Sequence, residues 1–176
     1  TFTIDSALAR LAIAEADRCQ STFEREMHER AQEVLDAVTA SGTFALVLCM
    51  RPYQNDPLVN HHVSKYFTRL GVPVIPSDIL PGLADEDLSG LEVRVNSNTQ
   101  ATQYAAAQIA ARHTNLELAQ ITSFGCGHDA ILTDEVLRIA QSQGKQVLLL
   151  KLDESDAVGP LRIRINSFID TVRQRR

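Results

Sequence analysis

The sequence has few cysteines, and their spacing excludes two kinds of scaffold. The three cysteines, Cys19, Cys49 and Cys126, are odd in number and far apart, and no C-x-x-C pair is present. Such spacing is not a disulfide framework, and it offers no self-contained zinc or cluster site. We therefore expect reduced thiols in a cytoplasmic protein, in which any metal site needs ligands from elsewhere.

Long apolar runs and an excess of positive charge are also missing. The longest apolar runs, 44–50 and 147–150, fall well short of the roughly 20 residues that span a bilayer. The formal net charge is −5 at pH 7 and the isoelectric point is about 5.5, whereas nucleic-acid binders normally carry a basic face. We expect neither a membrane nor a nucleic acid as partner.

The chain carries no glycine-rich phosphate loop, no G-x-G-x-x-G fingerprint and no Walker lysine. It has no export leader and begins at Thr1 rather than at methionine, which predicts a processed chain or a piece of a longer protein. Its 176 residues, 44% of them apolar, suffice for one domain with a sizeable core.

Apolar residues at three-to-four spacing predict helix over most of residues 1–42, capped by Asp5 or Ser6 and stopped by Ser41–Gly42. Whether this is one helix or two is left open by the pattern. After it, short apolar runs alternate with helical patterns. The predicted strands are 44–50, 72–75, 116–122 and 146–152, and the predicted helices are 58–70, 98–113, 133–143 and 160–173.

Strands separated by helices, without hairpin signals, predict an α/β fold with a four-stranded parallel, doubly wound sheet of the Rossmann or flavodoxin-like kind. The commonest small arrangement orders the strands 2-1-3-4. We expect an N-terminal helical segment over 1–42 and this α/β domain over 43–176. Ligands bind outside the carboxyl ends of the strands where the order reverses, which selects the loops 51–62 and 123–129.

The first loop is rich in hydrogen-bonding groups. Arg51 at a strand end is suited to clamp a carboxylate or phosphate, although an Arg51–Asp56 pair that pins the loop is an alternative. Asn60, His61 and His62 are expected at the start of the next helix. Neighbouring residues point about 100° apart on a helix, so the two histidines cannot both face one site.

The second loop brackets Cys126 with Gly125 and Gly127, which permits an unusual turn and lets a bulky partner approach the thiol. His128 and Asp129 follow, and Thr133 is predicted to cap the next helix. The thiol is a metal or cluster ligand, a nucleophile, or a small packed residue. Cys49 is predicted to be core, and the acids 153 and 154 are expected at the same edge of the sheet.

Three blocks of sequence, in order from about residue 44 to the end, resemble one bacterial family. They are LCMRPYQNDPLVNH (48–61) followed by LGVPV (70–74), NLELAQITSFGCGHD (115–129), and LLLKLDE (148–154) followed by RIRINS (162–167). The family is the acyl-CoA dehydratase activase-related family, whose large members carry a C-terminal region similar to 2-hydroxyglutaryl-CoA dehydratase subunits.

The resemblance implies a Rossmann-like domain of a longer protein that pairs an ATP-hydrolysing activase module with a dehydratase-like module. Iron–sulfur centres in the wider family pass one electron to a dehydratase that removes water from (R)-2-hydroxyacyl-CoA, a reaction of anaerobic metabolism. Carried over to this chain, Cys126 becomes the candidate thiolate ligand of a cluster. The residues implied to frame that pocket are Arg51, Tyr53, Asp56, Asn60, His61, Gly125, Gly127 and His128.

The chain departs from the family pattern at Gln54, His62 and His128, where the family has histidine, glycine and proline. Gln54 removes a titratable group from the first loop. A [4Fe–4S] cluster takes about four ligands, so the resemblance implies a cluster in the full-length protein and none in the isolated domain. The implied partners are other domains of the same polypeptide and an acyl-CoA dehydratase.

Three hypotheses for function follow. The first is a non-catalytic, redox-associated accessory domain of an activase-related protein. The second is a domain that binds CoA or phosphate through Arg51 and nearby helix N-termini. The third is a purely structural assembly domain.

Overall fold

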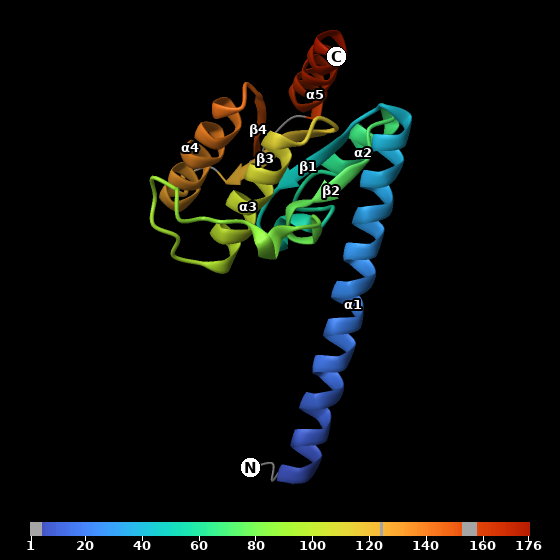
Figure 1. Cartoon of the computed structure of the whole chain (residues 1–176), viewed down its shortest axis with the longest axis vertical. Coiled ribbons are helices and arrows are strands. Elements are labelled where there is room, and N and C mark those ends of the chain that lie inside the picture. The colour runs from blue at the N-terminus through green and yellow to red at the C-terminus, as the bar shows by residue number, and fades with distance from the viewer. Residues whose placement is uncertain (1–4, 124, 153–157) are drawn as a thin grey trace.

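The computed structural model describes residues 5–123, 125–152 and 158–176 (Figure 1). The helices are α1 (Ser6–Ser41), α2 (Val63–Arg69), α3 (Asn98–Arg112), α4 (Gly127–Ser142) and α5 (Val158–Arg175), with short 3-10 turns η1 (Pro52–Asn55), η2 (Ser77–Ile79) and η3 (Leu83–Asp85). The strands are β1 (Ala45–Cys49), β2 (Val74–Pro76), β3 (Leu116–Ser123) and β4 (Val147–Leu152). None of the described helices is both long and apolar enough to cross a membrane.

The four strands form one sheet in the order β2-β1-β3-β4, and every pair is parallel. This confirms the predicted α/β class and the predicted 2-1-3-4 order. Cys49 lies opposite Gln120, and Thr122 lies opposite Lys151. The carboxyl ends of β1 and β3 are therefore neighbours, which sets the residues after each strand beside one another.

Successive side chains of a strand point to opposite faces, so each face of the sheet builds its own core. Val47 and Cys49 pack with residues of α1, α3 and α4, whereas Leu46 and Leu48 pack with residues of α2 and α5. The sheet is covered on both sides, as the continuous apolar run of β1 indicates. Cys49 is fully buried, as expected of a core residue.

The alanines of α3 explain how closely this helix lies on the sheet. Ala106, Ala107 and Ala110 are completely buried and belong to the core that contains Val47. A side chain of one methyl group lets the helix backbone approach the strands.

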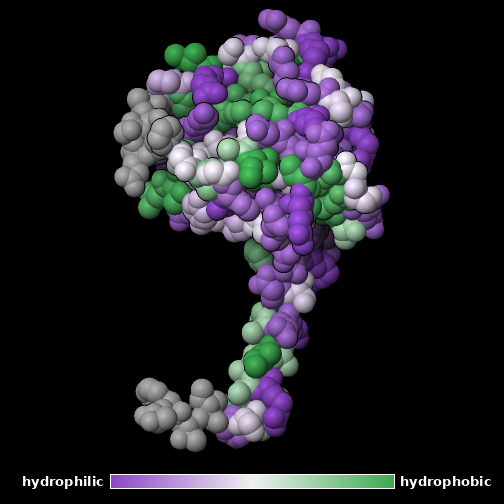
Figure 2. Space-filling model, turned by 90° about the vertical axis from the view of Figure 1, so that its left-hand side faces the viewer, coloured by the Kyte–Doolittle hydropathy of each residue, from purple (hydrophilic) through white to green (hydrophobic). Residues whose placement is uncertain are grey.

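Helix α1 is a single uninterrupted helix of 36 residues. The Asp5 side chain caps it by accepting a hydrogen bond from the Ala7 amide at 2.9 Å, and Gly42 ends it in the left-handed conformation, φ 66°. Of its residues, only Ala31 and Val38 are buried. The N-terminal part therefore extends away from the α/β body, with apolar side chains on its surface (Figures 1 and 2).

The predicted helix over 58–70 begins only at Val63. His61 and His62 have φ values of 51° and 57°, so they lie in a left-handed turn before the helix rather than in its first turn. The Asp56 side chain accepts a hydrogen bond from the Leu58 amide at 2.8 Å, and this turn competes with helix for the backbone groups.

The prediction that Thr133 caps a helix is also wrong. Helix α4 begins at Gly127, with Cys126 in the capping position, so Thr133 lies in its second turn. Asp129 is in the first turn, where its negative charge suits the helix dipole. The second strand is likewise shifted, from the predicted 72–75 to Val74–Pro76.

Candidate functional site

The loops that follow β1 and β3 meet at the carboxyl edge of the sheet, as predicted. Arg51 comes directly after β1, and Cys126 precedes α4 after β3. The Arg51 Nη2 donates a hydrogen bond to the Cys126 Sγ at 3.3 Å. The guanidinium and the thiol therefore share one site. The carboxylate partner of Arg51, however, is not the expected Asp56.

That partner is Asp129. The Arg51 Nε donates to the Asp129 Oδ1 at 2.9 Å, and the Arg51 Nη2 bonds the same oxygen. The Asp129 side chain is 5% exposed and that of Arg51 28%. The hydrogen bond to Asp129 raises the pKa of Arg51 above its ordinary value. The alternative Arg51–Asp56 pair is wrong, because the Arg51 guanidinium pairs with Asp129.

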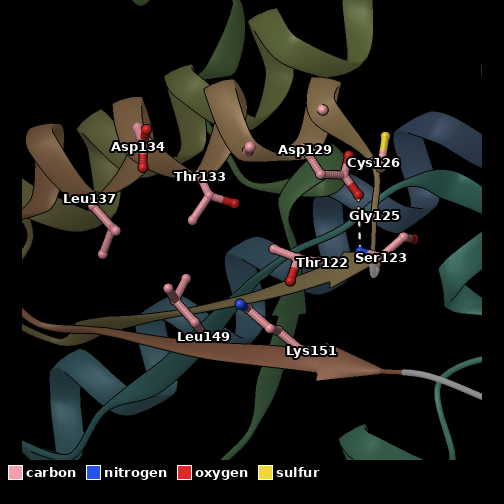
Figure 3. A pocket seen from close by; sticks show the side chains of 12 residues that line it. Thr122, Ser123, Gly125, Cys126, Asp129, Thr133, Asp134, Leu137, Leu149 and Lys151 are labelled. Carbon is pink, nitrogen blue, oxygen red and sulfur yellow. Dashed lines mark hydrogen bonds between the residues drawn. The ribbon is translucent and has the colours of Figure 1, made fainter.

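The other carboxylate oxygen of Asp129 accepts a hydrogen bond from the Ser123 amide at 3.0 Å (Figure 3). Asp129 thus ties the end of β3, the first turn of α4 and Arg51 together. A buried charge is tolerated when its oxygens are hydrogen-bonded to a cation and a backbone amide in this way. Sequence reasoning placed Asp129 in the loop without giving it this role, because the helix was predicted to begin at Thr133 and only the structure puts Asp129 in its first turn.

A second set of contacts joins the two loops through the Ser123 hydroxyl. Tyr53 Oη lies 3.1 Å from the Ser123 Oγ, and Gln54 Nε2 donates to the same oxygen at 3.2 Å. The Gln54 Oε1 accepts from the Arg51 amide at 2.8 Å, and the Gln54 carbonyl accepts from the Asn60 side chain at 2.8 Å. Gln54 is therefore a buried link that carries no titratable proton.

The predicted site residues divide accordingly. Arg51 and Cys126 meet directly, Tyr53 reaches the Ser123 hydroxyl beside them, and Asn60 is buried behind Gln54. Asp56 is exposed, and His61 is partly buried with no side-chain hydrogen bond to the rest of the described chain. His128 lines a separate cavity of about 340 Å³ with Arg51 and Tyr53, beside the first turn of α3.

The glycines beside Cys126 have different roles. Gly125 has φ 73°, a conformation that residues with a Cβ rarely adopt. At Gly127 an added Cβ would meet no atom within 4 Å, so the space next to this position is open. Cys126 is itself partly exposed. A partner group has room to approach the sulfur.

The side chains near Cys126 show whether this part of the chain could hold a metal cluster. Over residues 5–123, 125–152 and 158–176, no three side chains of cysteine, histidine, aspartate or glutamate converge on one point. Cys49 is fully buried, which raises the pKa of its thiol to about 12. This part of the chain offers Cys126 as a single ligand and does not fit a complete four-iron cluster. The acids 153 and 154 lie outside the described residues.

A larger cavity of about 550 Å³ lies beside Cys126, between α4 and the adjoining strands β3 and β4 (Figure 3). Thr122, Leu149 and Lys151 line it from the sheet, and Thr133 and Leu137 line it from the helix. The Thr122 and Thr133 hydroxyl oxygens are buried without a hydrogen-bond partner in the described structure.

Comparison with known proteins gives a match to a family model. Residues 1–80 match the family model described as CoA enzyme activase uncharacterised domain (DUF2229). No curated protein and no solved structure matches the chain. The matched segment contains α1, β1, the loop with Arg51, α2 and β2. Over these residues the match confirms the resemblance of this chain to the acyl-CoA dehydratase activase-related family.

Proposed function

We propose that this chain is a redox-associated accessory domain of a CoA enzyme activase-related protein, in which Cys126 supplies one thiolate ligand to an iron–sulfur cluster. Other domains of the same polypeptide supply the remaining ligands, and the cluster serves ATP-driven electron transfer to an acyl-CoA dehydratase. The observation that carries the proposal is the 3.3 Å hydrogen bond from the Arg51 Nη2 to the Cys126 Sγ.

The chemistry of this contact suits a ligand. A guanidinium can donate to a ligand sulfur, and hydrogen bonds to cluster sulfurs tune the reduction potential. Arg51 is held in place by Asp129, which is itself bonded to the Ser123 amide. The donor is therefore positioned before any partner arrives. When bound, the cluster supplies one-electron transfer, and this chain contributes the ligand and its charged neighbour.

A nucleophilic cysteine is the alternative use of this contact, because a neighbouring cation also suits a reactive thiol. The hydrogen-bond partner of the Cys126 Sγ in the described structure is Arg51, whose guanidinium has no acceptor and cannot act as a general base. The reconstitution test below separates the two uses, since only a ligand retains iron.

A partner that completes the site also accounts for the surface of α1. Leu8, Leu11, Ile13 and Phe23 are each more than half exposed on the part of α1 that leaves the body (Figure 2). Apolar side chains grouped on one segment are typical of an interaction surface. We infer that another domain of the parent polypeptide covers this segment.

The test is anaerobic reconstitution with ferrous iron and sulfide, in an excess of a small thiol that supplies the missing ligands. We expect the native chain to retain iron and sulfide through gel filtration, and Cys126→Ser to lose them. Cys19→Ser is the matched control, because Cys19 is an exposed thiol on α1. Equal iron retention by native and Cys126→Ser protein, or none in either, contradicts the proposal.

A second candidate is binding of CoA or another phosphate compound, favoured by the 340 Å³ cavity. Arg51 and His128 line it together with Ser97 and Thr99 at the N-terminus of α3, where backbone amides favour anions. The charge of Arg51 is already balanced by Asp129, which ranks this candidate second. A rise in melting temperature with CoA that is lost in Thr99→Val and His128→Gln supports it.

A further inference from the structure

We propose that the 550 Å³ cavity beneath α4 binds a small monocarboxylate with an apolar tail. The carboxylate lies at Lys151 and the hydroxyl groups of Thr122 and Thr133, and the tail lies between Leu137 and Leu149. Cys126 and Asp129 also line this cavity, but the proposed contacts use neither of them, and the inference does not rest on a cluster.

The first observation is the pair of hydroxyl groups without partners. Thr122 is 6% exposed, and its Oγ1 is fully buried with no hydrogen bond in the described structure. The Thr133 Oγ1 is also buried and unbonded, on the opposite wall of the cavity. Buried hydroxyl groups are normally hydrogen-bonded, and an unmade bond costs free energy. Both residues line the cavity, so a ligand oxygen bound there is the available acceptor for their hydroxyl groups.

The second observation is a positively charged side chain, Lys151, level with Thr122 in the sheet. Lys151 lies opposite Thr122 in the β3–β4 register, and both side chains line the cavity. In Figure 3 the nitrogen of Lys151 reaches toward the space beside Thr122 and Leu149. An ammonium group next to two hydroxyl groups is a combination that binds a carboxylate. Asp129 and Asp134 on α4 also line the cavity, and Asp129 is paired with Arg51, so the positive charge on the strand side is that of Lys151.

The third observation is that the apolar side chains of Leu137 and Leu149 line the rest of the cavity. Leu149 precedes Lys151 by two residues and therefore faces the same way, and Leu137 lies one helical turn after Thr133. Small-molecule sites are cavities of roughly 300–1,000 Å³ that are mostly apolar, with a few polar groups that fix orientation. The division of this cavity into a polar end and an apolar end matches that description.

The experiment is an NMR titration of the 176-residue chain with butyrate, hexanoate, octanoate and hexanamide. We expect hexanoate to bind more tightly than hexanamide, and each added methylene to strengthen binding up to about fourfold. Lys151→Met should weaken hexanoate binding about tenfold, as the loss of a charged hydrogen bond does. The matched control Lys65→Met, at an exposed lysine of α2, should leave it unchanged.

Two further variants separate binding from folding. Thr122→Val keeps the shape of the side chain and should weaken hexanoate binding without lowering the melting temperature. Leu137→Phe should abolish binding of octanoate before that of butyrate, because it shortens the apolar end. Equal affinity for hexanoate and hexanamide, unchanged affinity in Lys151→Met, or no chemical-shift change at the cavity residues would each overturn the proposal.

Discussion

The Arg51 Nη2 lies 3.3 Å from the Cys126 Sγ, although 75 residues separate the two along the chain. The contact exists because β1 and β3 are neighbours in the sheet, so the residues that follow them share one edge. Asp129 holds the guanidinium against the sulfur. The position of the guanidinium beside the thiol therefore depends on Asp129, which makes no hydrogen bond with Cys126 in the described structure.

Removing that carboxylate's charge should destabilise the fold. Asp129→Asn leaves the Arg51 guanidinium without its counter-charge, and we expect a loss of about 2 kcal/mol in the free energy of unfolding. The loss is below that of a fully buried pair because the Arg51 side chain is 28% exposed. Urea denaturation measures it, with Asp56→Asn as the exposed control. Equal stability of the two variants contradicts a structural role for the pair.

A half-buried lysine, Lys145, is expected to hold the end of α3. The Lys145 Nζ donates to the Ala110 carbonyl at 2.7 Å and the Leu116 carbonyl at 2.6 Å, and it also bonds the His113 carbonyl. The Ala110 carbonyl is in the last turn of α3, where carbonyls lack partners within the helix. Lys145→Met should cost about 2 kcal/mol, measured by urea denaturation. The same substitution at the exposed Lys65 should cost little, and a similar cost at both positions rejects this explanation.

Acid stability should depend on Glu135. The Arg138 side chain donates to both of its carboxylate oxygens, at 3.0 and 2.5 Å, and this lowers the pKa of Glu135 below its ordinary 4.5. A carboxyl group whose pKa is lower in the folded state stabilises the fold above about pH 4.5 and loses that contribution as the pH falls through the folded pKa.

The free energy of unfolding of the native chain should therefore fall more steeply below that pH than the free energy of Glu135→Gln. Denaturant titrations at a series of acid pH values measure the two slopes. Glu26→Gln, on the exposed surface of α1, is the control and should keep the native slope. Parallel curves for native protein and Glu135→Gln would show that other carboxylates govern acid unfolding.

The unpaired hydroxyl of Thr122 predicts a gain in stability. Thr122→Val replaces a buried hydroxyl group that has no partner by a methyl group of similar size, and we expect about 1 kcal/mol of added stability in thermal or urea unfolding. Thr102→Val is the comparison, because its hydroxyl already donates to the Asn98 carbonyl at 2.9 Å. Loss of stability in Thr122→Val would mean that the hydroxyl is satisfied by water in solution.

The sheet and the meeting of the two loops were predictable because both follow from local patterns. Apolar runs and helical spacing identify the strands and helices, and right-handed crossovers leave few orders for four parallel strands. The partner of Arg51 was not predictable in this way. Asp56 is near it in sequence, whereas Asp129 is near it in space, and the choice is made by the packing of α4 against β3.

The helix boundaries show the same limit. The pattern of apolar residues predicts helix from residue 58, but the Asp56 side chain bonds the Leu58 amide and delays α2 to Val63. The cavity beneath α4 also lies beyond sequence reasoning. Thr122 and Lys151 belong to different strands, and only the register of β3 and β4 brings them level.

The two glycines beside Cys126 give a matched pair of substitutions. Gly125 has φ 73°, so Gly125→Ala forces a left-handed conformation that costs a residue with a Cβ about 1–2 kcal/mol. Gly127 begins α4 with open space around it, so Gly127→Ala should be neutral or slightly stabilising, since alanine favours helix. Urea denaturation measures both.

The same pair tests the geometry at the sulfur. If the turn at Gly125 positions Cys126 against Arg51, Gly125→Ala should change the rate at which iodoacetamide alkylates Cys126, whereas Gly127→Ala should leave it near the native rate. Mass spectrometry of the alkylated peptide reads this rate apart from that of Cys19. An unchanged rate in Gly125→Ala, despite lower stability, would mean that the Arg51 contact rather than the turn controls access to the thiol.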